Sequence, residues 1–316
     1  MLKTIKSLID TSKTVAIFFH INPDGDAVGS SLALKFGLEQ MGKTVTVFSS
    51  DEISDELDFL NYRSIKIHTT NEKFDLAIVL DCPDIKRIGS MIDVYKNCKK
   101  TLNIDHHLNN MHFADVTLVD PKASSTCEIL YFLLKDLGVK FNKDISKSLY
   151  TGLATDSGCF MYNITKSLHS IAELLIENID NVEQINYKLF REKKKEDLAL
   201  YAEAISRLEY YYNNKFAITY VTTKDFEKLQ TTDESTPGLI FLLSGLKDID
   251  ILCVMCEEPG AKYKVAFRSN TTNVCNFASL FGGGGHKFAS GCKIYGTKNT
   301  VKKKILEKAR EFLCTE

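Results

Sequence analysis

Short apolar runs alternate with segments of helical periodicity over the first half of the chain. Four of these runs are rich in β-branched and aromatic residues and predict strands: Val15–Phe19, Thr44–Phe48, Leu76–Leu80 and Thr101–Ile104. Apolar residues spaced as on one face of a helix predict four helices: Ala27–Leu38, Ser124–Leu137, Ser146–Ala154 and Ser167–Ile176. Such alternation is typical of an α/β fold in which helices cover both faces of a parallel sheet. We expect this parallel-sheet domain to span residues 1–190.

The pattern changes after Phe190. A charged run at residues 191–197 leads into an amphipathic segment, and we interpret residues 191–212 as a solvated helical linker. Beyond it, apolar and β-branched residues again predict strands: Lys215–Thr222, Ile249–Glu257, Lys262–Arg268 and Lys293–Tyr295. At 316 residues the chain is longer than one hydrophobic core usually supports, about 250–300 residues. We therefore predict a second, smaller mixed α/β domain over residues 213–316.

Positive and negative charges nearly cancel in this chain. It has 40 basic and 41 acidic residues and a formal net charge of -1. Because proteins that bind long nucleic acids usually have a basic domain, we expect any nucleic-acid substrate to be short. No apolar segment approaches the ~20 residues of a membrane span. The apolar residues of Met1–Lys13 have helical spacing rather than the unbroken core of a signal peptide, which favours a cytoplasmic location without a membrane partner.

Nine cysteines are scattered along the sequence. An odd number in a cytoplasmic protein favours reduced thiols over a disulfide framework. Cys253 and Cys256 have C-x-x-C spacing, but they lie in a predicted strand, where residues three apart face opposite sides. We interpret this pair as structural and all nine residues as reduced: Cys82, Cys98, Cys127, Cys159, Cys253, Cys256, Cys275, Cys292 and Cys314.

A loop with one imidazole and two carboxylates follows the first predicted strand. It runs from His20 to Asp26, and Pro23 and Gly25 interrupt regular structure within it. Open α/β sheets bind ligands at the carboxyl ends of their strands. His20, Asp24 and Asp26 offer side chains suited to a divalent ion such as Mn²⁺, Fe²⁺ or Co²⁺. The alternative is that Asp24 or Asp26 simply caps the following helix, which leaves His20 unexplained.

Further acidic residues and two histidines stand at the ends of other predicted elements. Asp81 follows one strand, Asp105-His106-His107 follows another, and Asp156 follows a helix. A single aspartate after a strand is more often a turn or cap residue. The carboxyl ends of parallel strands lie side by side, however, so we predict that these residues converge with the first loop on a metal site.

Four consecutive glycines and a histidine, Gly282 to His286, stand out in the second domain. Such a run is costly in backbone entropy, and a simple turn needs one or two glycines. It can present backbone N–H groups as an anion-binding concavity, to which His286 adds a side-chain donor. Arg268, at the end of a predicted strand, can hold a phosphate with two hydrogen bonds. The alternative is a flexible loop with a packed histidine.

Taken in order, these motifs resemble those of the DHH phosphoesterases. The loop His20–Asp26, then Asp81, then Asp105-His106-His107, then Asp156, resemble the four N-terminal motifs of that family. The glycine run with Arg268 upstream resembles its DHH-associated C-terminal domain. The resemblance covers nearly the whole chain, and its length and two domains are similar to the nanoRNase and pAp-phosphatase branch. One departure is Ser157 after Asp156, where the family often has threonine.

The resemblance implies roles for individual residues. Six would hold two divalent ions, Mn²⁺ with Mg²⁺ or Co²⁺ as alternatives: His20 and Asp24 on one, Asp26, His106 and Asp156 on the other, and Asp81 between them. His107 would contact the substrate phosphate, and Asp105 would orient a neighbouring imidazole. The implied substrate contacts are Arg268, Gly283, Gly284, Gly285 and His286, with Arg87, Ser125 and Thr126 as weaker candidates.

The implied function is Mn-dependent hydrolysis of short RNA oligonucleotides and dinucleotides to mononucleotides, and dephosphorylation of the 3′,5′-bisphosphate nucleotide pAp, by a homodimer. Two metal ions would activate the attacking water. One alternative is a cyclic-di-AMP or linear dinucleotide phosphodiesterase. Another is an inorganic pyrophosphatase, whose lysine- and arginine-rich phosphate motif is missing from this sequence. A third is a catalytically silent nucleotide-binding protein, although every expected ligand is present.

Overall fold

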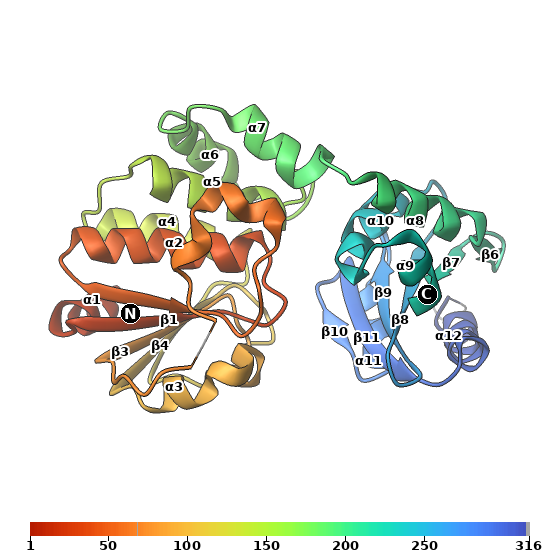
Figure 1. Cartoon of the computed structure of the whole chain (residues 1–316), viewed down its shortest axis with the longest axis horizontal. Coiled ribbons are helices and arrows are strands. Elements are labelled where there is room, and N and C mark those ends of the chain that lie inside the picture. The colour runs from red at the N-terminus through yellow and green to blue at the C-terminus, as the bar shows by residue number, and fades with distance from the viewer. Residues whose placement is uncertain (68, 314–316) are drawn as a thin grey trace. The chain divides into compact units, whose positions relative to one another are not determined.

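The computed structural model describes residues 1–67 and 69–313, and Cys314 of the predicted reduced thiols lies outside them. The chain forms two compact units, Met1–Glu192 and Lys193–Glu316 (Figure 1). In the part that the structure describes, no helix is long and apolar enough to cross a membrane.

A five-stranded parallel sheet forms the centre of the first unit, in the order β2-β1-β3-β4-β5. Its strands are β1 (Thr14–Phe18), β2 (Thr44–Phe48), β3 (Leu76–Leu80), β4 (Lys100–Asp105) and β5 (Val116–Val119). Strands β1 and β3 lie inside the sheet, and β3 is buried along its whole length. The predicted α/β class and its parallel sheet are confirmed. Strand β5 was not predicted, because it is a short edge strand with every residue half-buried.

Helices cover both faces of this sheet (Figure 1). The helices on one side are α1 (Leu2–Thr11), α2 (Gly25–Gln40), α4 (Thr126–Asp136), α5 (Lys143–Asp156), α6 (Leu168–Ile176) and α7 (Val182–Asn186), and α3 (Ile92–Lys96) lies on the other side. Alternate residues of β1 separate the two cores: Val15 and Ile17 face α2, α4 and α5, whereas Ala16 and Phe18 face α3. The described residues of this unit also form the 3₁₀ elements η1 (Asp55–Leu60), η2 (Tyr62–Ser64) and η3 (Ile85–Met91) and the π-helical turn η4 (Tyr187–Arg191).

Helices α2 and α5 pack so closely that glycine is required where they meet. A Cβ on Gly29 would lie 2.3 Å from the carbonyl oxygen of Ser148, a backbone atom that cannot rotate away. In Gly29→Ala the steric overlap should cost about 1–3 kcal/mol. The higher helix propensity of alanine offsets only ~1 kcal/mol of this cost, so we expect a lower free energy of unfolding. Urea unfolding measures the loss. Gly245→Ala, where the added Cβ meets open space, is the control, and equal unfolding midpoints for both variants would contradict the close packing.

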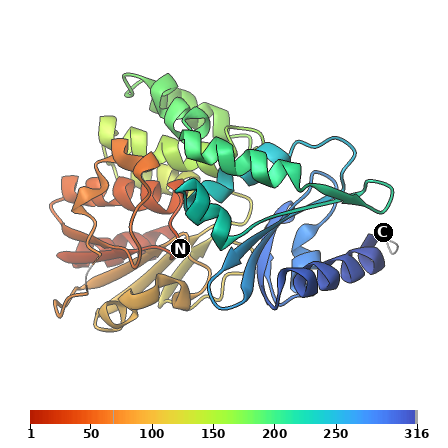
Figure 2. The same ribbon diagram turned by 45° about the vertical axis from the view of Figure 1, so that its right-hand side comes forward.

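The second unit contains a mixed six-stranded sheet in the order β10-β11-β9-β8-β7-β6. Its strands are β6 (Glu209–Tyr211), β7 (Phe216–Val221), β8 (Ile251–Glu258), β9 (Lys262–Arg268), β10 (Gly284–Gly285) and β11 (Ala289–Tyr295). Its helices are α8 (Lys195–Ser206), α9 (Thr223–Leu229), α10 (Thr236–Leu243), α11 (Val274–Ser279) and α12 (Lys298–Leu313), with one turn, η5 (Asp233–Ser235), before α10. One face packs on α11 and α12, which is dark blue in Figure 2, and the other on α8 and α10.

The second unit decides two interpretations of the sequence, the linker at residues 191–212 and the cysteine pair in β8. Residues 191–212 do not form a solvated linker, because Leu200, Tyr201 and Ala204 of α8 are buried in the core of the second unit. The charged run before α8 concealed this apolar face. Cys253 and Cys256 do face opposite sides of β8, one in each core of the second unit, and burial raises the pKa of the Cys256 thiol to about 12. Both are structural thiols.

Candidate metal centre

The parallel strands bring the predicted histidines and acids together at one edge of the first sheet. His20 follows β1, Asp81 follows β3, and Asp105 ends β4. Asp26 lies in the first turn of α2, and Asp156 is the last residue of α5. Three groups of these residues, two of which share Asp81, each place their ligand atoms within 4.8 Å of one another: His20, Asp24 and Asp81; Asp26, His106 and Asp156; Asp81, Asp105 and His107.

The first group is built on the loop after β1. The Nε2 atom of His20 lies 3.8 Å from Oδ2 of Asp24 and 3.4 Å from Oδ2 of Asp81. Its Nδ1 atom lies 2.8 Å from the carbonyl oxygen of Ile21, which fixes the proton on Nδ1 and leaves the Nε2 lone pair for a cation. Asp24 also caps α2, since its Oδ1 accepts from the N–H groups of Asp26 and Ala27. Capping uses one oxygen of Asp24 and leaves the other available.

The second group joins α2, α5 and the end of β4. The Nε2 atom of His106 lies 3.1 Å from Oδ2 of Asp156. The carboxylate of Asp26 is fully buried and accepts from the backbone N–H groups of Thr126 and Cys127, at 2.7 and 3.0 Å. Asp26 therefore lies at the N-terminus of α4, where backbone N–H groups stabilise a negative charge.

Asp81 lies between the two groups. Its Oδ2 is 3.4 Å from Nε2 of His20, and its Oδ1 is 3.5 Å from Nε2 of His106. The backbone of Asp81 has φ 52°, a left-handed conformation that costs of order 1–3 kcal/mol outside glycine. Asn103 holds this turn on both sides, because its Nδ2 donates to the carbonyl oxygens of Val79 (3.1 Å) and Cys82 (3.2 Å).

The crowding of buried acids changes their protonation. Burial, together with the charges of Asp156 and Asp81, raises the pKa of Asp26 well above its usual value, and burial raises that of Asp156 to about 6. Burial alone would lower the pKa of His20, but its hydrogen bond to Asp81 and the nearby carboxylates raise it to about 9. Protons and cations thus compete for the same atoms, and the carboxylate and imidazole donors fit divalent ions such as Mn²⁺.

Asp105 is hydrogen-bonded to the side chain of His107. Its Oδ1 lies 2.7 Å from Nδ1 of His107 and accepts from the N–H of His106 at 2.9 Å. Its Oδ2 accepts from Nδ2 of Asn110 at 2.6 Å. These donors engage both oxygens of a fully buried carboxylate, and the orienting role that the family resemblance implies for Asp105 stays a prediction. The side chain of His107 is 17% exposed and accessible to a ligand.

The weaker substrate candidates have different surroundings. Ser125 and Thr126 are fully buried, so the predicted substrate contacts do not fit them. Ser125 caps α4 by accepting from the N–H of Glu128, and Thr126 donates its hydroxyl to Oδ1 of Asp81 at 3.2 Å. Both residues lie at the N-terminus of α4 and support the cluster from there. Arg87 is half-buried in η3; its carbonyl oxygen accepts from the N–H of Ile21, and its charge opposes protonation of His20.

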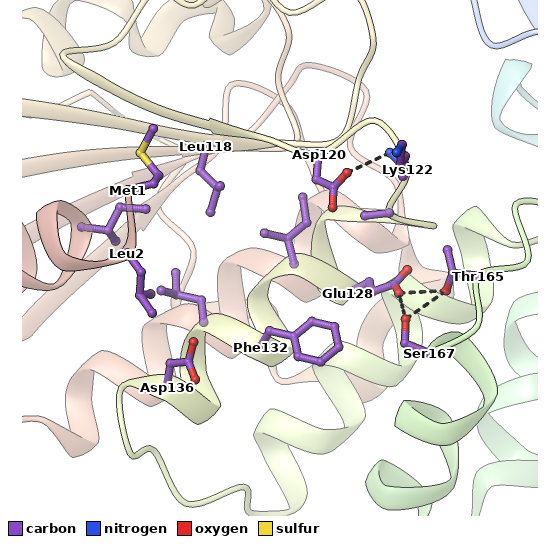
Figure 3. Close-up of a pocket in the computed structure, with 14 residues that line it drawn as sticks. Met1, Leu2, Leu118, Asp120, Lys122, Glu128, Phe132, Asp136, Thr165 and Ser167 are labelled. Carbon is purple, nitrogen blue, oxygen red and sulfur yellow. Dashed lines mark hydrogen bonds between the residues drawn. The ribbon is translucent and has the colours of Figure 1, made fainter.

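Glu128 is a buried residue near the cluster that the sequence analysis did not identify. It lies in the wall of a largely apolar hollow of about 490 Å³ between α1, β5 and α4 (Figure 3). Its carboxylate accepts hydrogen bonds from the hydroxyls of Thr165 and Ser167 and from the N–H of Ser124, which fixes the turn that leads into α4. The capping-box pattern Ser125-x-x-Glu128 is the signal that could have identified it.

In the second unit, the register of the sheet brings Arg268 and the turn that begins at His286 to the same end. Arg268 pairs with Ala289, which exchanges backbone hydrogen bonds with His286. The predicted anion-binding concavity is smaller than expected, because the N–H of Gly283 donates to the carbonyl oxygen of Ala278. Gly283 instead permits close packing, since a Cβ there would lie 2.2 Å from the oxygen of Gly291. Gly284, Gly285 and His286 are exposed.

The chain is similar to a family of known proteins in both sequence and fold. Residues 14–154 match the DHH family, N-terminal domain. The chain is 29% identical over 300 residues to the bifunctional oligoribonuclease and PAP phosphatase NrnA of Bacillus subtilis, covering 93% of this chain and 92% of that protein. It is 27% identical to the protein of the same name from Thermus thermophilus, covering 95% and 90%. The crystal structure of an exopolyphosphatase-related protein from Bacteroides fragilis superposes with a TM-score of 0.88 at 26% identity, over 99% of this chain and 97% of that one. Residues 14–154 form a DHH family N-terminal domain.

Proposed function

We propose that the chain is a phosphoesterase that hydrolyses short RNA oligonucleotides and dinucleotides to mononucleotides and removes a phosphate from pAp, with two divalent ions, preferably Mn²⁺. The observation that carries this proposal is the position of Asp81 between two groups of candidate ligands. The names of the relatives from Bacillus subtilis and Thermus thermophilus support the choice of substrates.

In this proposal His20 and Asp24 hold one ion, Asp26, His106 and Asp156 the other, and Asp81 both. Two ions in these positions would activate water and stabilise charge on the phosphoryl oxygens. His107, held through Nδ1 by Asp105, presents Nε2 to the phosphoryl group, where the imidazolium form would donate a hydrogen bond to a phosphoryl oxygen.

A substrate panel tests the proposal. The purified protein is incubated with Mn²⁺ and, separately, a labelled RNA dinucleotide, pAp, cyclic di-AMP and pyrophosphate. We expect release of mononucleotide from the dinucleotide and of phosphate from pAp, with the other two compounds hydrolysed more slowly. Preferential hydrolysis of cyclic di-AMP would favour a cyclic-dinucleotide phosphodiesterase, and preferential hydrolysis of pyrophosphate a pyrophosphatase. Binding of nucleotides without hydrolysis would favour a silent binding protein.

The second unit should supply recognition of the rest of the substrate through Arg268 and His286. Arg268→Ala is expected to weaken dinucleotide cleavage by about 1.5–3 kcal/mol in kcat/KM, the worth of a hydrogen bond to a charged group. Hydrolysis of a small artificial phosphodiester should hardly change, because that compound lacks the part that Arg268 recognises. Lys264→Ala, an exposed position on the same strand, is the matched control. An equal loss on both substrates would mean that Arg268 supports the fold instead.

A further inference from the structure

Asn110 joins the backbone next to Asp81 to the side chain of His107. Its Nδ2 atom lies 2.6 Å from Oδ2 of Asp105 and 2.8 Å from Oδ1 of Asn103. Its Oδ1 atom accepts from the N–H of His112 at 2.8 Å. Donation on one side and acceptance on the other fix the orientation of the Asn110 amide.

The far end of this chain of hydrogen bonds is firmly anchored. Asn103 is fully buried on β4, and its Nδ2 donates to the carbonyl oxygens of Val79 and Cys82 at the end of β3. Since the donors of Asn103 are engaged by β3, its Oδ1 is the atom that remains to receive Asn110. The position of Asn110 is therefore set by the backbone of two neighbouring strands.

The near end determines how His107 is presented. Asp105 accepts from Nδ1 of His107 with Oδ1 and from Asn110 with Oδ2. A carboxylate that accepts at Nδ1 holds the ring proton there and leaves the lone pair on Nε2. If the donor at Oδ2 is removed, a buried oxygen loses its partner and the carboxylate can rotate away from His107.

We propose that Asn110 is a positioning residue, which fixes the ring orientation and tautomer of His107 through Asp105. The contribution to turnover rests on the proposed function, because it requires that His107 contacts the phosphate; the effect on the tautomer does not. The competing explanation is that Asn110 merely supports the turn through His112.

Two substitutions separate these explanations. Asn110→Ala removes both the donor to Asp105 and the acceptor of the His112 N–H. Asn110→Asp keeps that acceptor and loses the amide donor; because a carboxyl group beside Asp105 donates only while it is protonated, the tautomer and kcat of this variant are compared with the wild type at pH 7 and at pH 9, and the comparison at pH 9 decides. Asn109→Ala is the matched control, the neighbouring asparagine with an exposed side chain. Long-range ¹H–¹⁵N NMR of the full chain labelled with ¹⁵N-histidine, without Mn²⁺, reports the tautomer of His107, and His107→Gln assigns its signal.

The wild type and Asn109→Ala should show His107 protonated on Nδ1, and both Asn110 variants a mixture of tautomers. In both variants kcat should fall about 10- to 100-fold, with KM changed less than about twofold. An unchanged tautomer and kcat in Asn110→Asp, with losses confined to Asn110→Ala, would assign Asn110 to the turn and overturn the proposal. A third outcome is also possible: His107 has the Nδ1 tautomer in the wild type, both Asn110 variants alter that tautomer, and the wild type does not hydrolyse the dinucleotide. This outcome would support the positioning by Asn110 and refute the proposed function.

Discussion

Replacement of Asp81 by asparagine is expected to abolish hydrolysis, with a loss of at least about 10³-fold in kcat, or ~4 kcal/mol. Asparagine keeps the size of the side chain and removes the negative charge between the two histidines. Each oxygen of Asp81 faces the Nε2 atom of a different histidine, so one substitution disturbs both groups of candidate ligands. Initial rates of dinucleotide cleavage at saturating Mn²⁺ measure the effect.

The control for this variant is Asp93→Asn, an exposed aspartate in α3. It should retain wild-type activity. The thermal unfolding of Asp81→Asn should also be recorded, because Asp81 has a left-handed backbone that asparagine tolerates as well as aspartate does. A folded Asp81→Asn protein that keeps more than about a tenth of the activity would exclude the bridging role.

The two neighbouring histidines should have separable functions. His106→Gln is expected to lose one metal ion, because Nε2 of His106 lies with Asp156 and Asp26 in one group of candidate ligands. His107→Gln should keep two ions and lose about 10²–10⁴-fold in kcat, the usual contribution of a group that exchanges protons or hydrogen bonds with the reacting atoms. Atomic emission on both purified variants counts the ions.

These two variants are each other's control, since they make the same substitution at adjacent positions. Their rings lie 4.9 Å apart, so a general disturbance of the segment would affect both equally. Equal loss of metal in the two proteins would contradict this division of roles. If thermal unfolding of both variants then matches the wild type, the loss assigns His107 as a further ligand, through the group that it forms with Asp81 and Asp105.

Much of the first unit could be predicted because its strands are buried and their ends are chemically distinct. β2 and β3 have the predicted bounds, since each is a short β-branched run. The convergence of His20, Asp81 and Asp105 followed from parallel strands alone. Residues at the ends of such strands are brought together by topology, whatever the loops between them do.

What could not be predicted depends on single contacts that leave no periodic pattern. Asn103 and Asn110 are ordinary polar residues in the sequence, and their importance appears only once β3 and β4 are paired. Ser125 and Thr126 lie near the cluster as expected, but as a helix N-terminus that turns inward they are buried. The buried face of α8 was hidden by the charges that precede it.

In the proposed site two ions share Asp81, and electron paramagnetic resonance of a Mn²⁺ titration shows whether they do. Two manganese ions about 3.5–4 Å apart are magnetically coupled, whereas isolated ions give independent spectra. We expect saturation at two Mn²⁺ per chain with a coupled spectrum in the wild type, and loss of that coupling in Asp81→Asn. Saturation with one ion, or two ions with uncoupled spectra in the wild type, would contradict the shared site.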